Sequence, residues 1–387
     1  MPPLARAREQ FAALGSRIYL DICARAPLPA KTVQAMSDYF DVCMSEGARK
    51  EEWLDHMEVV RARTAALIGA TGDELAYVKS TSEGVNVFAS GIDWRPGDNL
   101  IITPDLEHPN NIYPWLNLRR RGVEIRFAKP IDGQFSVADI TRLADRRTRV
   151  VVAAHVCFLN GARADLNALA DAAHAAGALL FIDAAQSVGL MDLDVRAAGV
   201  DGLAACVHKG LLAPYGMGIF YCRRELVPEL TPAYMARAGV DLADKREFVM
   251  GDLHNVRLSP TARRFEFGSY NFPAIYGLGA SVELLAGWGM ASIEQHVLSQ
   301  SQRIFKSLTD AGLAVFSPSA EAARSHLVCV RDHDAESLVD QFEKAGVRVS
   351  ARLGVLRVAV GPYTHDDDIT RFLGLLGQFK KKPVLVP

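Results

Sequence analysis

Between about residues 60 and 225 the chain alternates short apolar runs with segments whose apolar positions recur at helical spacing. This alternation is typical of a parallel sheet whose strands are joined by crossover helices. Several of the runs are apolar throughout rather than at every second position, which predicts that those strands are buried on both faces. We therefore predict an α/β fold with strands at residues 98–104, 123–129, 149–156, 178–184, 202–207 and 218–222.

The clearest predicted helix covers residues 165–177. Leu166 and Leu169 lie at helical spacing within a run of alanines. Asp165 is suited to cap the first turn, and Gly177 is suited to end the last turn.

The pattern becomes irregular and polar between about residues 230 and 270, as expected of a long functional loop. Two helices and a small strand and helix pattern follow, at residues 273–289, 291–313, 326–331, 335–346, 347–352, 355–360 and 366–379. We predict a large domain at residues 20–260 and a small α/β domain formed by residues 1–19 and 261–387.

Composition narrows the class of protein. Of the 387 residues, 49% are hydrophobic and 23% charged, which is typical of a globular protein with a sizeable core. The net charge of -2 gives no indication that the protein binds nucleic acid or an anionic membrane. We expect a cytoplasmic protein, because no segment resembles a signal peptide or a membrane span. The six scattered cysteines and the unclustered histidines predict reduced thiols and no metal site.

The strongest chemical signal follows two neighbouring predicted strands, in FIDAAQSVG (181–189) and AACVHKG (204–210). Ligands of open α/β sheets bind at the carboxyl ends of strands. An enzyme that uses pyridoxal 5'-phosphate (PLP) needs a lysine that bonds to the cofactor and a carboxylate that keeps its ring nitrogen protonated. Asp183 and Lys209 supply both groups. Taken alone, a strand-ending aspartate and a surface lysine remain the simpler interpretation.

Two further segments support a cofactor site. The hydroxyl groups of Thr81 and Ser82 precede a helical pattern, so the start of that helix would point at a phosphate, although a plain helix cap is equally consistent. His108 follows a predicted strand and is suited to stack on a flat ring, although most single histidines are structural. Gln186, three residues after Asp183, is suited to donate a hydrogen bond to a ring hydroxyl, and His208 directly precedes Lys209.

The order of these features along the chain resembles the class V aminotransferase family of fold-type I PLP-dependent enzymes. This family includes cysteine desulfurases, selenocysteine lyases and isopenicillin N epimerase-like proteins. The resemblance extends over nearly the whole chain, through residues 18–29, 208–221, 265–271 and 355–369. It implies a large domain with a mostly parallel, seven-stranded type of sheet, a smaller carboxyl-terminal domain, and an active site between them.

The resemblance also implies PLP as the cofactor and assigns roles to the residues around it. Thr81 and Ser82 would hold the phosphate. His108 would stack on the ring, Asp183 would pair with the ring nitrogen, and Gln186 would contact the ring oxygen.

The remaining roles concern catalysis, the substrate and a second subunit. Lys209 would bond to the cofactor and move a proton, and His208 would add a phosphate contact. Ser269 would reach the phosphate of a neighbouring subunit, which implies a homodimer with shared active sites. Arg357 would bind the α-carboxylate of the amino-acid substrate with its bidentate guanidinium group.

Several positions depart from the family pattern. Phe158 stands where many desulfurases have an asparagine, and Asn160 lies two residues later. Cys206 replaces a phosphate-binding serine. Desulfurases carry a nucleophilic cysteine before the substrate arginine, but residues 349–358 contain no cysteine. Cys329 lies in an apolar strand pattern that is typical of the core.

These departures favour a lyase that eliminates a side-chain substituent, such as a sulfur-containing group, without storing a persulfide. An epimerase or racemase is the alternative, and it needs a second acid–base group such as Tyr215 or His254. Transamination is a third possibility, and a binding protein without catalysis is a fourth. The intact Asp183, Gln186, His208 and Lys209 argue against the fourth.

Overall fold

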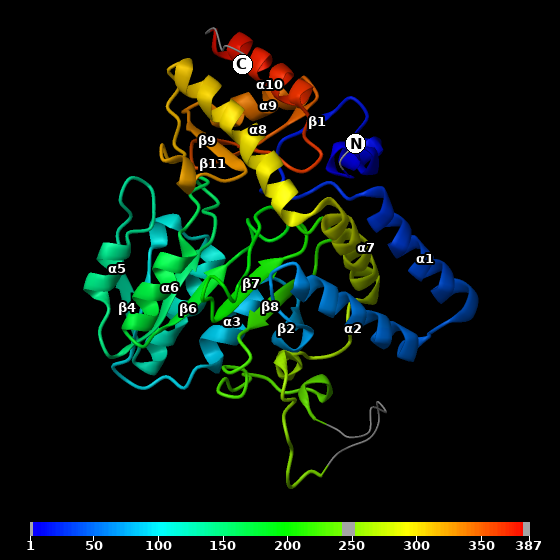
Figure 1. Cartoon of the computed structure of the whole chain (residues 1–387), viewed down its shortest axis with the longest axis vertical. Coiled ribbons are helices and arrows are strands. Elements are labelled where there is room, and N and C mark those ends of the chain that lie inside the picture. The colour runs from blue at the N-terminus through cyan, green and yellow to red at the C-terminus, as the bar shows by residue number, and fades with distance from the viewer. Residues whose placement is uncertain (1–2, 242–251, 382–387) are drawn as a thin grey trace.

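The computed structural model describes residues 3–241 and 252–381. Its central sheet has seven strands in the order β2-β8-β7-β6-β5-β3-β4 (Figure 1). The strands are β2 (Leu75–Val78), β3 (Asn99–Ile102), β4 (Glu124–Phe127), β5 (Thr148–Ala154), β6 (Leu179–Asp183), β7 (Gly202–Cys206) and β8 (Gly218–Cys222). Only β8 runs in the opposite direction to the other six strands, so the sheet is mostly parallel, as predicted.

Helices cover both faces of this sheet, which explains its continuous apolar strands. The helices of the large part are α1 (Ala30–Glu46), α2 (Lys50–Ala66), α3 (Thr81–Gly91), α4 (Tyr113–Leu116), α5 (Val137–Leu143), α6 (Leu166–Ala175) and α7 (Phe272–Trp288). In β6, Leu180 and Ile182 belong to the apolar cluster that includes residues of α2, α6 and α7. Phe181, between them, belongs to the cluster that includes α3.

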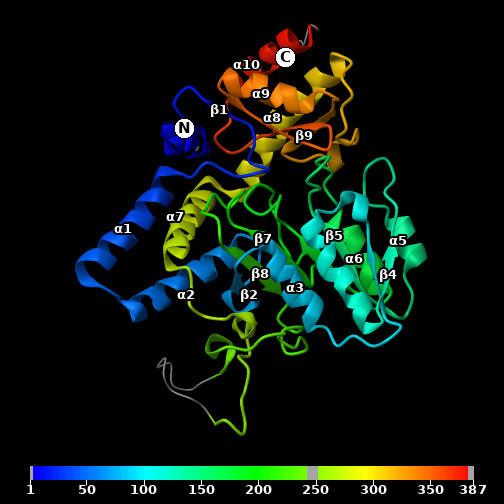
Figure 2. The same cartoon turned by 180° about the vertical axis from the view of Figure 1, so that it is seen from behind.

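A smaller α/β part lies above the large sheet in both views and contains both ends of the described chain (Figures 1 and 2). Its elements are β1 (Ile18–Tyr19), α8 (Met290–Asp310), β9 (Leu327–Arg331), α9 (Ala335–Lys344), β10 (Val347–Arg348), β11 (Ser350–Arg352), β12 (Val355–Ala359) and α10 (Asp366–Lys380). β11, β12 and β9 form an antiparallel sheet. β1 pairs with β10, so the beginning of the chain is anchored in its last third.

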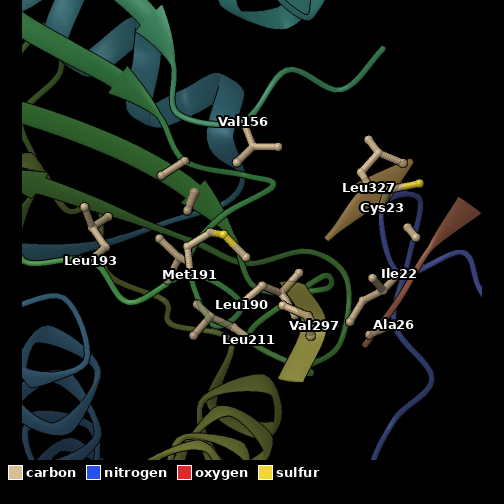
Figure 3. Packing of buried hydrophobic residues seen from close by; sticks show 14 of the residues in the cluster. Ile22, Cys23, Ala26, Val156, Leu190, Met191, Leu193, Leu211, Val297 and Leu327 are labelled. Carbon is tan, nitrogen blue, oxygen red and sulfur yellow. The ribbon is translucent and has the colours of Figure 1, made fainter. Parts of the chain in front are cut away.

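The predicted boundary near residue 260 stays a prediction. α7 follows that boundary in sequence and packs against α1 and α2, beside the large sheet (Figure 2). One apolar cluster continues from this layer into the smaller part. Figure 3 shows Ile22, Cys23 and Ala26 of the amino-terminal segment near Leu327 of β9. The two parts therefore share one hydrophobic core.

The predicted elements are confirmed in most places. Asp165 caps α6 by accepting a hydrogen bond from the amide of Ala168, and Gly177 has the positive φ of a helix end. The segment predicted as one strand at 347–352 forms the two short strands β10 and β11, which belong to different sheets. Of the predicted loop at 230–270, residues 242–251 lie outside the described part. Within the described ranges, no helix combines the length and the apolarity that crossing a bilayer requires.

α3 packs unusually close to the sheet because glycine stands at its contact with β7. A Cβ on Gly84 would lie 2.7 Å from the Cβ of Ala204. A Cβ on Gly202 would lie 2.3 Å from the ring of Phe88, which is in α3. The first turn of α3 is therefore held directly above the carboxyl end of β7.

We expect Gly84→Ala to lower the free energy of unfolding by about 1–3 kcal/mol, because the added methyl group forces α3 away from the sheet. Urea denaturation of the purified protein measures this change. Gly374→Ala in α10 is the matched control, since nothing lies within 4 Å of its added Cβ. The control should gain up to about 1 kcal/mol from helix propensity. Equal stability of the two variants would contradict the close packing.

Candidate active site

A cavity of about 370 Å³ lies where β5, β6 and β7 end. Its walls include the last residues of those strands, namely Ala154, Asp183 and Cys206. All but one of the predicted site residues line it, namely Thr81, Ser82, His108, Asp183, Gln186, His208, Lys209 and Arg357. The structure thus brings together residues from distant parts of the chain; Thr81 and Arg357 are 276 positions apart in the sequence.

The first turn of α3 forms one wall of the cavity. Ser80 caps the helix, and its hydroxyl accepts a hydrogen bond from the amide of Glu83. Thr81 and Ser82 occupy the next two positions and face the cavity. The first amides of a helix have no partner within the helix and carry partial positive charge. This wall is therefore suited to an anion such as a phosphate group.

Asp183 ends β6 and is buried, and one of its oxygens accepts a hydrogen bond from the amide of Ala185. Burial raises the pKa of this carboxyl above its ordinary value, although the positive charge of Lys209 lowers it. A cationic group in the cavity would favour the carboxylate in the same way as Lys209 does.

Gln186 differs from the expectation in the direction of its hydrogen bond. The sequence predicts that its amide donates to the ligand. In the structure Nε2 donates to the carbonyl of Cys23, whereas the buried Oε1 has no partner. The free group is therefore an acceptor, and it is suited to a ligand hydroxyl that donates.

The loops after β6 and β7 are held together by two glycines. A Cβ on Gly189 would lie 2.3 Å from the carbonyl oxygen of Gly210, and a Cβ on Gly210 would lie 2.3 Å from that of Val188. No other residue fits at either position without displacing a backbone. This contact fixes the loop that carries Lys209 against the loop that follows Asp183.

Lys209 is half-buried and faces the cavity. Within the described ranges its amine forms no hydrogen bond and no salt bridge. The preceding carbonyl, of His208, accepts a hydrogen bond from the amide of Ala26 and so ties the lysine loop to the amino-terminal segment. The amine is accessible for a covalent bond while its backbone is fixed.

Two histidines of the cavity are neutral at physiological pH. Burial and the charges of Lys209 and Arg357 lower the pKa of His108 to about 4. Burial and the charge of Lys209 also lower the pKa of His208 to about 4. His108 accepts a hydrogen bond from the amide of Asn110, which orients its ring.

Arg357 is 3% exposed and lies on β12. Its Nη1 donates to the carbonyl oxygen of Phe158 at 3.0 Å, and its Nη2 donates to the hydroxyl of Ser350 at 3.0 Å. Ser350 in turn donates to Asp21 at 2.6 Å. The buried Nε has no partner. These contacts hold the guanidinium in one orientation and leave donor capacity for a ligand.

Glu107 is a buried carboxyl that the sequence gave no reason to select. Its Oε1 accepts a hydrogen bond from the amide of Ala154, and its Oε2 accepts one from the side chain of Asn111. Burial raises the pKa of Glu107 to about 8, with a smaller contribution from the neighbouring charge of Asp183. Glu107 thus ties the segment that carries His108 to the end of β5. A lone acidic residue beside a histidine has no sequence signature of burial.

The positions that depart from the family pattern have clear structural places. Phe158 lines the cavity, and its ring lies edge-on to His108 with centroids 5.0 Å apart. Asn160 does not line the cavity and instead bonds to Gly133 and Ala162. Cys329 is fully buried in β9, which confirms it as a core residue.

Three predicted residues have different outcomes. Ser269 is exposed and has a φ of 50°, but it does not line the cavity of its own chain, so its role stays a prediction. Tyr215 lines the cavity and stacks on His208 with ring centroids 3.7 Å apart. His254 is exposed in a turn and does not line this cavity, so the sequence-based suggestion of an acid–base role for it lacks support within one chain.

Comparison with known families identifies the chain. The model of the family described as "Aminotransferase class-V" matches residues 18–372. The chain belongs to the class V aminotransferase family. It is therefore a PLP-dependent enzyme, and the family predicted from the sequence is confirmed.

Relatives within the family have related names. The chain is 33% identical to a "probable cysteine desulfurase" of Methanothermobacter thermautotrophicus, over 78% of this chain and 75% of that protein. It is 30% identical to a cysteine desulfurase of Pectobacterium atrosepticum, over 82% of this chain and 80% of that protein.

Solved structures share the fold. Apo cysteine desulfurase from Thermococcus onnurineus superposes with a TM-score of 0.88 at 22% identity, covering 97% of this chain and 98% of that one. A cystine C-S lyase in complex with its product cysteine persulfide superposes with a TM-score of 0.86 at 21% identity, covering 95% and 99%. These likenesses confirm the predicted fold class.

We expect Glu107→Gln to change how stability depends on pH. The folded chain keeps a proton on Glu107 up to about pH 8, whereas an unfolded glutamate releases it near pH 4.3. The folded state therefore binds more protons between these values, and its stability falls as pH rises through this window. Glutamine has the shape of the neutral acid and does not titrate.

Urea denaturation of the cofactor-free wild type and variant at pH 5 and pH 8 measures this difference. The variant should gain at least about 1 kcal/mol relative to the wild type between the two values. All other groups titrate in both proteins, so the difference isolates Glu107. A difference that is constant with pH would contradict the assignment.

Proposed function

We propose that the chain is a PLP-dependent lyase that breaks the bond between the β-carbon and sulfur of a sulfur-containing amino acid. The observation that carries the proposal is the single cavity that brings Asp183, Lys209 and Arg357 together. The names of the relatives, cysteine desulfurase and cystine C-S lyase, favour a lyase over an epimerase.

The unpartnered groups of the cavity fit the cofactor. The free acceptor of Gln186 suits a ring hydroxyl, and the first turn of α3 suits a phosphate. Asp183 would hold the ring nitrogen, and the flat ring of His108 would stack on the cofactor. Cys206 lines the cavity where family members have a serine, and a thiol is a weaker hydrogen-bond partner. The phosphate would therefore depend mainly on α3 and His208.

Lys209 and Arg357 would act on the substrate. When bound, PLP withdraws electrons from the α-carbon of the attached amino acid. The amine of Lys209 takes the α-proton, while Arg357 holds the α-carboxylate through its free donor capacity. His108 is neutral at physiological pH, so it adds no positive charge that would compete for the carboxylate.

The proposed reaction is a β-elimination that balances without an oxidant or reductant. The α-proton leaves to Lys209, and the bond between the β-carbon and sulfur breaks. Sulfur leaves with the bonding electron pair and is protonated to a thiol. The three-carbon fragment takes up water and gives pyruvate and ammonia. A substrate that is a disulfide would release a persulfide instead of a thiol.

The hairpin before Arg357 leaves no place for a thiol that stores sulfur. β11 and β12 are joined by Leu353 and Gly354 alone, and both residues have positive φ. This is the two-residue turn of a tight hairpin. Cys329 and Cys157 are buried, and burial raises the pKa of the Cys157 thiol to about 11. Cys23 and Cys206 line the cavity, but both are buried, and burial raises the pKa of each thiol. Sulfur should therefore leave with the product rather than remain on the chain.

We also propose a homodimer, with Ser269 reaching the phosphate of the neighbouring cavity. Ser269 is exposed at a positive φ, and the nearby rings of Tyr234 and Phe267 are exposed as well. Exposed aromatic groups are typical of interfaces. The cytoplasm remains the proposed location, because all six cysteines are free.

Incubating the enzyme with S-substituted L-cysteines in deuterated water tests the reaction. Release of pyruvate, ammonia and a thiol without an added keto acid is the expected result, and mass spectrometry detects it. Lys209→Ala should reduce the rate at least about 1000-fold, because it removes both the covalent bond and the base. Lys344→Ala, an exposed lysine of α9, is the control. Deuterium at the α-carbon with inverted chirality and no pyruvate would instead establish an epimerase.

Arg357→Gln should raise KM at least about tenfold, because it removes a charge-assisted bond to the substrate carboxylate. The absorbance of bound PLP should be retained, since none of the groups proposed to hold the cofactor is changed. Steady-state kinetics and the absorbance spectrum give the two measurements. Loss of the cofactor together with the substrate would show that Arg357 belongs to the cofactor site.

A further inference from the structure

A second arginine, Arg352, lines the same cavity as Arg357. The register of the hairpin places Ser350 opposite Arg357 and Arg352 opposite Val355. Residues 350 and 352 therefore lie on the same face as 355 and 357, because side chains two apart in a strand share a face. The hydrogen bond from Arg357 to Ser350 is direct evidence of this arrangement.

Arg352 and Arg357 are diagonal neighbours on this face. Diagonal positions of an antiparallel pair lie roughly 7–8 Å apart, and arginine side chains reach across that distance. Arg357 is buried at the inner wall, whereas Arg352 is exposed beside the turn. The tight turn at Leu353, which has a φ of 51°, fixes Arg352 relative to Arg357. The cavity therefore carries one guanidinium deep inside and one towards its opening.

Within the described ranges neither guanidinium pairs with a carboxylate. Arg352 donates only to the carbonyl of Ala351, and Arg357 donates to Phe158 and Ser350. The positive charge of Arg352 acts on groups inside the cavity, since it contributes to the lowered pKa of His108. Two like charges at diagonal positions of one face repel each other, and an anion that contacts both relieves this repulsion. A substrate that carries two carboxylates would supply such a contact to each guanidinium.

We propose that Arg352 binds a second carboxylate, at the far end of the substrate side chain, while Arg357 binds the α-carboxylate. The preferred substrate is then an L-cysteine whose sulfur carries a substituent that ends in a carboxylate. This inference rests on the proposed function for the reaction, and it adds the charge that the leaving group must carry. The leaving sulfur of such a substrate would lie between its two carboxylates.

A pair of matched compounds tests the inference. S-(2-carboxyethyl)-L-cysteine and S-(2-carbamoylethyl)-L-cysteine have the same size and differ in the charge of the terminal group. Titrating the holoenzyme and following the cofactor absorbance gives Kd for each compound, and pyruvate release measures elimination separately. We expect the wild type to bind the carboxylate at least about fivefold more tightly at low salt, with a smaller preference at high salt.

Arg352→Gln should reduce this preference to within about twofold, because it removes the charge while keeping a polar side chain. Lys344→Gln is the matched control, since it removes one positive charge from an exposed position that does not line the cavity, and it should keep the preference. Equal Kd values in the wild type, or a preference that survives in Arg352→Gln, would overturn the inference. Tight binding of the carboxylate without pyruvate release would support the inference and contradict the proposed lyase.

Discussion

The backbone contact between Gly189 and Gly210 is the constraint on which the site depends. It joins the loop after β6 to the loop after β7 at a distance that only glycine allows. Asp183 and Lys209 come from neighbouring strands of one sheet, but the strands alone do not fix the loops beyond them. The glycine contact does so without using a polar side chain, and the polar groups nearby remain available to a ligand.

A second constraint positions Arg357, the arginine proposed to bind the substrate. Asp21, Ser350 and Arg357 form a chain of hydrogen bonds that begins near the amino terminus and ends at the cavity. The carbonyl of Phe158 holds the other side of the guanidinium. One wall of the cavity thus comes from the large sheet and the other from the smaller part. The shared hydrophobic core fixes the position of one wall relative to the other.

The sequence predicted what depends on local pattern and failed where distant partners decide. Continuous apolar runs identified β5, β6 and β7, because burial on both faces leaves a clear signal. No strand was predicted at β2, which is placed in the sheet by pairing with β8, far along the chain. The split of residues 347–352 follows from pairing with two different strands, which no local property reveals. Glu107 escaped notice for the same reason, since only the folded sheet brings its carboxyl to the amide of Ala154.

The order of the site along the chain has a consequence during synthesis on the ribosome. The groups assigned to the cofactor, apart from Ser269, are all translated once the seven strands of the large sheet exist, by Cys222 of β8. Arg357 emerges much later, and the bond between Asp21 and Ser350 joins residues 329 positions apart. A nascent chain therefore contains the residues proposed to bind the cofactor well before it contains the arginine proposed to bind the amino acid, so the proposed reaction would have to wait until translation is nearly finished.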